Sequence, residues 1–200
     1  GAPAARAAVI ETRGEIRLGD RRRPLRARQV IVPGRGFVWA ARVGRGPAAV
    51  TGFDRYLAGA GAMRWRLLGV PVVSAAGPDI DRSAAGRLAA ETLLVPPALV
   101  GSGVGWDDAG PDSAVARVRE GDAVHRVTVV VDGDGRLAEV SLARWGSPGG
   151  GPFREAVFRV RMEGEARHDG IALPAGYEAG WDDDPAGAFM RCEVLGARLR

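Results

Sequence analysis

Asp81-Arg82-Ser83-Ala84-Ala85-Gly86-Arg87-Leu88-Ala89-Ala90-Glu91-Thr92-Leu93-Leu94-Val95 differs from the rest of the chain, because it is rich in alanine and leucine and poor in β-branched residues. Asp81 or Ser83 can cap its first turn, and Pro96-Pro97 stops it. Its residues Ala85, Leu88, Ala89, Thr92 and Leu93 fall on a single stripe at helical spacing. The stretch predicts one long amphipathic helix over about residues 82–95.

On both sides of this segment, apolar and polar residues alternate, as in strands that bury one face. Asp132-Gly133-Asp134-Gly135 is typical of a hairpin turn, because glycine accepts a positive φ. The spacing of the alternating stretches predicts an antiparallel arrangement of about 10–11 strands. The clearest stretches are Ala8–Leu18, Leu25–Val32, 37–43, Val50–Leu57, 63–67, 125–131, 136–145, 154–167, 171–182 and 189–200.

One helix cannot cover both faces of so many strands, and it is better suited to cap one concave face. We therefore expect a mainly β (α+β) fold, in which a curved antiparallel sheet or incomplete β-barrel wraps around one long α-helix. The chain shows no repeat of fixed period and no linker long enough to separate two domains, so residues 1–200 are expected to form a single domain.

The 28 basic residues are all arginine, and the formal net charge is +4. Residues 1–70 carry 14 of them against four acids, whereas the remainder is net acidic. Most of these arginines alternate with apolar residues, which favours a solvated strand face over a nucleic-acid site, although a basic face toward an anionic partner stays open. The longest apolar runs, such as Leu93-Leu94-Val95, are too short for an integral membrane segment.

Few residues suggest a cofactor or metal. The glycine-rich stretch 101–105 follows a helix, whereas a dinucleotide fingerprint lies between a strand and a helix. Asp182-Asp183-Asp184 precedes Pro185 and is interpreted as a polar hairpin tip more readily than as a cation site. The single cysteine, Cys192, excludes an internal disulfide. We expect neither a cofactor nor a metal site.

The aromatic residues of the strands either fill the core or line a cavity for an apolar ligand. The candidate cavity residues are Phe37, Trp39, Met63, Trp65, Leu67 and Trp106, with Tyr177 and Trp181 nearer the mouth. Asp54 and Glu178 are lone acids within apolar strands, and a buried carboxylate needs a partner such as Arg64 or Arg144. Either arginine could instead hold an acidic head group.

Several motifs occur in an order that resembles a bacterial family, common in actinobacteria, known only as a domain of unknown function. They are 13–18 (RGEIRL), 24–29 (PLRARQ), 33–39 (PGRGFVW), Asp54-Arg55-Tyr56, 59–68, the 82–97 helix and Arg144-Trp145-Gly146. The resemblance implies a fold similar to the Lol-type lipoprotein carriers, in which a curved sheet wraps a helix around an apolar cavity for acyl chains. It also implies an additional N-terminal stretch, so that this chain is the truncated body of such a protein. It transfers no catalytic residue.

Three functions compete at this point. The leading interpretation is a non-enzymatic binding protein that holds a hydrophobic or lipid-like ligand on the concave face. The second is an interaction scaffold whose basic N-terminal half meets an acidic partner. The third is an enzyme in which Glu178, in a dry pocket with a raised pKa, acts as acid or base. Without a visible leader we expect a cytoplasmic protein, or an envelope protein if a leader was trimmed; the sequence does not indicate an oligomeric state.

Overall fold

Thirteen strands form one antiparallel sheet in the computed structural model, which describes residues 6–101 and 103–200. The strands are β1 (Ala8–Leu18), β2 (Arg21–Val32), β3 (Gly36–Val43), β4 (Val50–Leu57), β5 (Ala60–Leu67), β6 (Val70–Ala76), β7 (Val104–Gly110), β8 (Ser113–Glu120), β9 (Ala123–Val131), β10 (Leu137–Gly146), β11 (Arg154–His168), β12 (Ile171–Trp181) and β13 (Met190–Leu199). A short 3₁₀ turn, Pro148–Gly150, lies between β10 and β11.

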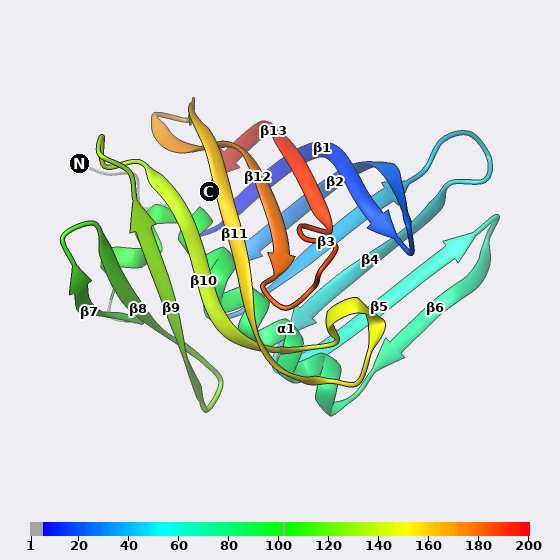
Figure 1. Cartoon of the computed structure of the whole chain (residues 1–200), viewed down its shortest axis with the longest axis horizontal. Helices are drawn as coiled ribbons and strands as arrows, with labels where there is room; N and C mark the ends of the chain where they lie inside the picture. The colour runs from blue at the N-terminus through cyan, green and yellow to red at the C-terminus, as the bar shows by residue number, and fades with distance from the viewer. Residues whose placement is uncertain (1–5, 102) are drawn as a thin grey trace.

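The sheet consists of two meanders that meet at its centre. Its order is β6-β5-β4-β3-β2-β1-β13-β12-β11-β10-β9-β8-β7, so β1 pairs with β13 and the free edges are β6 and β7. Between these two edges the chain passes through the helix α1 (Pro78–Glu91), which lies across the concave side of the curved sheet (Figure 1). The expected curved antiparallel sheet around one helix is confirmed.

The structure has more strands than expected. The sequence analysis missed β6, β7 and β8, and the first two are the edge strands. All but one residue of β6 are exposed, and β7 has no buried residue, so neither shows the alternation of a strand with one buried face. β8 does alternate in its second half, where Ala116 and Val118 are buried.

The helix begins four residues before the expected start. Gly77, with φ of 112°, precedes it, and Pro78 occupies its first turn, where a missing N–H costs nothing. Asp81 does not cap the helix: its Oδ1 accepts a hydrogen bond from the backbone N–H of Gly61 at 2.6 Å, which ties α1 to β5. The expected last turn of the helix tightens into the 3₁₀ segment Thr92–Leu94, and a second 3₁₀ segment, Pro96–Val100, follows.

The helix divides the core of the concave face into two clusters. Ala84, Ala85 and Leu88 pack among the inward residues of β1–β4 and β13, and Ala89 and Leu93 pack among those of β8–β12. Leu88 and Ala89 are fully buried although they are neighbours in sequence, because the sheet curves around the helix. In the part of the chain that the structure describes, no helix has the length and hydropathy to cross a membrane.

Candidate ligand-binding cavity

A cavity of about 530 Å³ lies between α1 and the concave face of the sheet. Its walls are mainly apolar and come from both halves of the molecule. The lining residues are Ile16, Leu18, Gln29, Trp39, Val43, Val50, Asp54, Met63, Trp65, Val72, Val73, Arg87, Ala90, Glu91, Val140, Arg144, Phe158, Val160, Met162, Tyr177, Ala179, Trp181, Phe189 and Met190. The single helix thus leaves part of the concave face uncovered.

The structure brings six of the sequence-selected residues together around this cavity. They are Trp39, Met63, Trp65, Tyr177, Trp181 and Arg144. The register explains the N-terminal group, because Trp39 lies opposite Asp54, and Asp54 lies opposite Met63. The rings of Trp39 and Trp65 contact each other with centroids 5.7 Å apart.

Three apolar residues expected in the cavity lie elsewhere. Phe37 is 2% exposed and belongs to the core, where the guanidinium of Arg87 covers its ring at 4.5 Å. Leu67 ends β5 beside the hairpin and is only half-buried. Trp106 lies on the edge strand β7, is 43% exposed, and donates its indole N–H to the carbonyl of Leu99. Strand parity selected these residues correctly for a face, but it does not define how far the cavity extends along that face.

Two of the three polar candidates also lie outside the cavity. Arg64 is exposed and donates to the carbonyls of Met63 and Ala75, because it alternates with the cavity residues of β5. Glu178 pairs with Arg191 at 2.5 Å (Oε1–Nε), because its position on β12 alternates with those of Tyr177 and Ala179. The expectation that Glu178 faces a dry pocket is therefore wrong.

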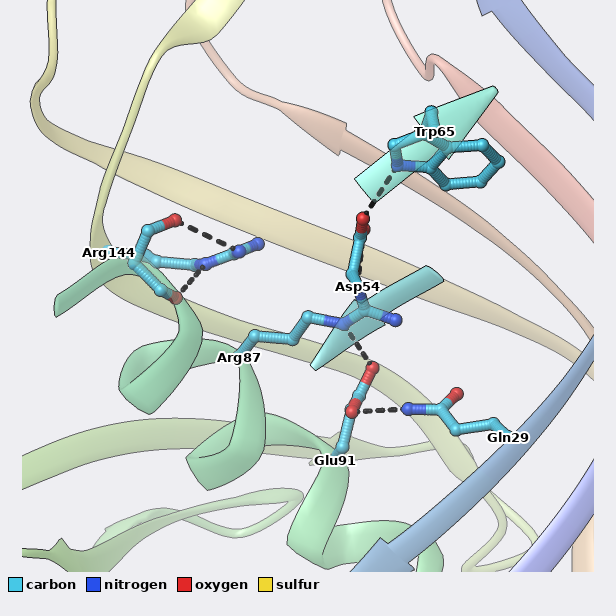
Figure 2. A network of polar contacts seen from close by, with 7 residues as sticks. Gln29, Asp54, Trp65, Arg87, Glu91 and Arg144 are labelled. Atoms are coloured by element: carbon cyan, nitrogen blue, oxygen red, sulfur yellow. Dashed lines mark hydrogen bonds and ion pairs between the residues drawn. The ribbon is translucent and has the colours of Figure 1, made fainter. Parts of the chain in front are cut away.

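A polar network crosses one wall of the cavity (Figure 2). The Arg87 Nε donates to Glu91 Oε1 at 2.7 Å, and its other end lies 3.3 Å from Asp54 Oδ2. Asp54 Oδ1 accepts a hydrogen bond from the Trp65 indole at 2.9 Å, and Glu91 Oε2 accepts one from the Gln29 amide at 2.5 Å. Each carboxylate oxygen in the network therefore has one donor, which offsets the cost of burial.

Burial and the neighbouring charges move the pKa values of the network in defined directions. Burial raises the pKa of Asp54 above its ordinary value, and the nearby Arg87 and the Trp65 hydrogen bond only partly oppose this. Burial alone would lower the pKa of Arg87, but Glu91 and Asp54 outweigh it and the net direction is upward. Arg87 thus stays a cation that pairs with both carboxylates of the wall.

Arg144 is in a different environment. It donates from Nε to the Ser83 carbonyl at 3.1 Å and from the other end to the Ser83 hydroxyl at 3.2 Å. Its guanidinium lies over the rings of Phe158 and Trp181, at 4.9 and 5.4 Å from their centroids. Burial first, and the positive charge of Arg87 second, lower its pKa to about 10. Among residues 6–101 and 103–200, no carboxylate forms an ion pair with it.

The sequence analysis missed the partners in this wall. It offered Arg64 or Arg144 to Asp54, but the partner is Arg87, which comes from the helix. The sequence did indicate the pairing of Arg87 with Glu91, because the two residues are four positions apart on a predicted helix and therefore face each other. Gln29 gave no signal beyond its parity with the buried residues of β2.

The three aspartates after β12 are each engaged by an arginine. Asp182 pairs with Arg159, Asp183 with Arg154 and Asp184 with Arg17. Within the described ranges, no three His, Cys, Asp or Glu residues are grouped as metal ligands would be. Of the glycine-rich stretch 101–105, residue 102 lies outside the described residues, and β7 begins at Val104.

Solved structures similar to this one share its architecture at very low sequence identity. A LolA superfamily protein from Nitrosomonas europaea aligns with a TM-score of 0.54 at 8% identity, over 97% of this chain and 86% of that one. A DUF1329 family protein from Desulfovibrio piger aligns with a TM-score of 0.52 at 11% identity, over 98% of this chain and 86% of that one. At such identities the likeness concerns the fold alone.

Sequence comparison gives the family. No protein with a curated function matches this chain. The model described as "Family of unknown function (DUF6544)" matches residues 1–192, which is nearly the whole sequence. The chain therefore belongs to DUF6544.

Proposed function

We propose that this protein is a non-enzymatic binding protein that holds a hydrophobic or lipid-like molecule between α1 and the concave face of the sheet. The observation that carries the proposal is the apolar cavity of about 530 Å³, which falls within the roughly 300–1,000 Å³ of small-molecule sites. The LolA-like fold supports it, because the same arrangement of sheet and helix recurs in that superfamily. The ion pair of Glu178 with Arg191 removes the residue on which the enzymatic alternative depended.

The ligand that fits best is an amphiphile with an acidic head group. Arg87 has ion-pair partners in Glu91 and Asp54, whereas Arg144 borders the same cavity with direct contacts to Ser83 and two aromatic rings and with no ion pair in the described residues. A carboxylate or phosphate would give Arg144 the charge-assisted hydrogen bonds that its surroundings do not provide. Its apolar chain would lie against Trp39, Trp65 and their neighbours, where removal from water contributes about 25 cal/mol per Å².

The test compares a fluorescent fatty acid, cis-parinaric acid, with its methyl ester. We expect the ligand-free protein to bind the acid more tightly than the ester. Replacing Arg144→Met should remove this preference with little change in affinity for the ester, because the two probes differ in the charge of the head group and share the apolar chain. Equal affinity of the native protein for both probes would contradict the role of Arg144.

A second pair of variants tests the cavity itself. Ala90 is half-buried on α1 and lines the cavity, so Ala90→Trp should fill it and abolish binding of both probes. Ala143 is exposed on β10, one residue before Arg144, and does not line the cavity. Ala143→Trp is therefore the matched control and should bind both probes normally. If Ala90→Trp folds normally and still binds them, the proposed site is wrong.

A further inference from the structure

Arginines face one another across neighbouring strands on the convex side of the N-terminal meander. Arg13 lies opposite Arg26, Arg26 opposite Arg42, and the next positions in this line are Thr51 and Arg66. We call Arg13, Arg26, Arg42 and Arg66 the arginine row; all four are exposed. Like charges directly opposite each other on paired strands destabilise a sheet, so an anion bound over the row would relieve this repulsion.

The two halves of the convex side differ in how their arginines are compensated. In the C-terminal meander, arginines of β8–β13 pair with carboxylates of their own half: Arg117 and Arg126 with Asp107, Arg159 and Arg161 with Glu139, and Arg191 with Glu178. In the described part of the N-terminal meander, Arg26, Arg42 and Arg66 form no ion pair, and Arg13 reaches Glu193 of β13. Arg119, Arg167 and Arg198 of the C-terminal meander also form no ion pair with any described residue, but each lies opposite a valine or alanine, so the unpaired arginines that face one another across strands are those of the row.

An exposed apolar hairpin lies beside the row. Leu68, at the turn between β5 and β6, is 71% exposed, and Val70 and Val72 on β6 are 63% and 51% exposed. Arg66 lies in β5, two residues before Leu68. Leu68 lies at the tip of the hairpin, and Val70 and Val72 lie on the face opposite Arg66, so apolar and basic side chains meet at this end of the strands. Such an end suits the interface of a bilayer, where chains and anionic head groups meet.

The strand ends near the row also border the cavity, which lies on the other face of the sheet. The register places Val43, Val50, Leu67 and Val70 in one line across β3–β6, so the β3–β4 and β5–β6 hairpins end together, at the right of Figure 1. Val43, Val50 and Val72 also line the cavity. Arg42 and Arg66 are each one residue away from this line, on the opposite face of the sheet.

We propose that the protein docks onto anionic lipid bilayers through the arginine row and the exposed β5–β6 hairpin, with the hairpin end of the strands, where Val43, Val50 and Val72 line the cavity, nearest the membrane. The row supplies charge complementarity to acidic head groups, and the hairpin selects a bilayer over a purely polar acidic surface. Docking in this orientation would let an amphiphile pass between the bilayer and the cavity; that last step rests on the proposed function, whereas docking does not.

The experiment measures co-sedimentation with vesicles of phosphatidylcholine alone or with 30% phosphatidylglycerol, at 150 mM NaCl. We expect binding to the anionic vesicles only. The variant R26Q/R42Q/R66Q should bind them about a hundredfold more weakly, since each basic residue near an anionic surface contributes a factor of about five. The control R119Q/R167Q/R198Q removes the same charge from exposed residues of β8, β11 and β13 and should bind nearly as well as the native protein.

The hairpin is tested with L68N/V70T. Leu68 has a positive φ of 50°, a conformation that asparagine adopts more readily than leucine, so this variant should fold at least as well as the native chain. We expect its binding to anionic vesicles to fall at least tenfold, because even partial burial of two apolar side chains contributes that much. Soluble polyglutamate should compete only weakly with the vesicles.

Three results would overturn the proposal: no binding to anionic vesicles, equal loss in the two triple-arginine variants, or full competition by polyglutamate with no effect of L68N/V70T. The last would indicate an acidic protein as the partner. The Ala90→Trp variant separates this proposal from the proposed function, because a filled cavity should abolish probe binding and leave vesicle binding intact.

Discussion

The guanidinium of Arg87 and the carboxylate of Asp54 form an ion pair, 3.3 Å from nitrogen to oxygen, where α1 packs against β4. Both side chains are largely buried, at 18% and 17% exposure, and Arg87 also binds Glu91. The helix is thus connected to the wall of the cavity through charge as well as through apolar contact. Because both partners are buried, losing one of them leaves the other uncompensated.

Replacing Arg87→Met should lower the free energy of unfolding by about 3 kcal/mol or more, the usual effect of breaking a buried ion pair. Urea unfolding measures the loss. The variant R87M/D54N/E91Q should recover part of it, because both carboxylates are then neutral. If the triple variant is less stable than Arg87→Met alone, the charges of this wall are not what the arginine compensates.

Glu120 predicts a dependence of stability on pH. It is 4% exposed at the end of β8, accepts one hydrogen bond from the Gly34 N–H at 3.3 Å, and burial raises its pKa from the ordinary 4.5 to about 7. The folded protein then holds this proton more tightly than the unfolded chain, so its contribution to stability is present at low pH and is lost as the pH rises from 4.5 through 7. At pH 8 the loss is on the order of 3 kcal/mol.

Glu120→Gln should therefore be more stable than the native protein at pH 8, with an advantage that shrinks as the pH falls toward 5. Thermal melts at both pH values measure this difference. Glu11→Gln, at an exposed position of β1, is the control and should follow the native protein at both pH values. An equal effect of Glu120→Gln at pH 5 and pH 8 would contradict a buried, protonated carboxyl.

The seam between the two meanders depends on a glycine. A Cβ on Gly14 of β1 would overlap the carbonyl oxygen of Arg191 in β13, whereas a Cβ on Gly196 of β13 would meet nothing within 4 Å. Gly14→Ala should therefore destabilise the protein by roughly 2 kcal/mol or more, as overpacking against backbone does. Gly196→Ala is the matched control in the adjoining strand and should change the midpoint of urea unfolding by much less.

Arg144 should be unfavourable for stability in the ligand-free protein. Its lowered pKa, about 10 against 12.5, means that folding penalises the charged form by on the order of 3 kcal/mol, from which the two hydrogen bonds to Ser83 recover part. Arg144→Met should thus melt at a higher temperature than the native protein, opposite to Arg87→Met. A lower melting temperature would show that Arg144 is a structural cation.

The architecture could be predicted from the sequence because the chain has a single helix-forming segment, centred near Leu88. Many segments in which apolar and polar residues alternate surround it. The edge strands could not be predicted in the same way. Neither Val70–Ala76 nor Val104–Gly110 contains a buried residue. Their sequences therefore lack the alternation of apolar and polar residues that predicts a strand with one buried face. The helix start was four residues off because Asp81 or Ser83 was taken as the cap, whereas Gly77 is the cap residue and Pro78 begins the helix.

Only some of the residues that line the candidate cavity could be predicted from the sequence. Parity placed Trp39, Met63 and Trp65 on one face, and the register then brought them together. Parity could not distinguish Phe37, which lies beneath Arg87 in the core, from Trp39, which borders the cavity two residues later. The partners of Asp54 and Glu178 depend on which strands and helix residues are adjacent, and this information is absent from any single stretch of the chain.

The central seam also constrains how the protein is made. Arg13 of β1 bonds Glu193 of β13, a partner 180 positions later in the chain. During synthesis, the edge of β1 that pairs with β13 therefore has no partner strand until β13 has emerged from the ribosome. Its backbone N–H and C=O groups are hydrogen-bonded to water until then. Contacts so distant in sequence slow folding and leave a strand edge open to wrong partners. Mispairing at β1 is therefore expected during synthesis until β13 joins it in the sheet.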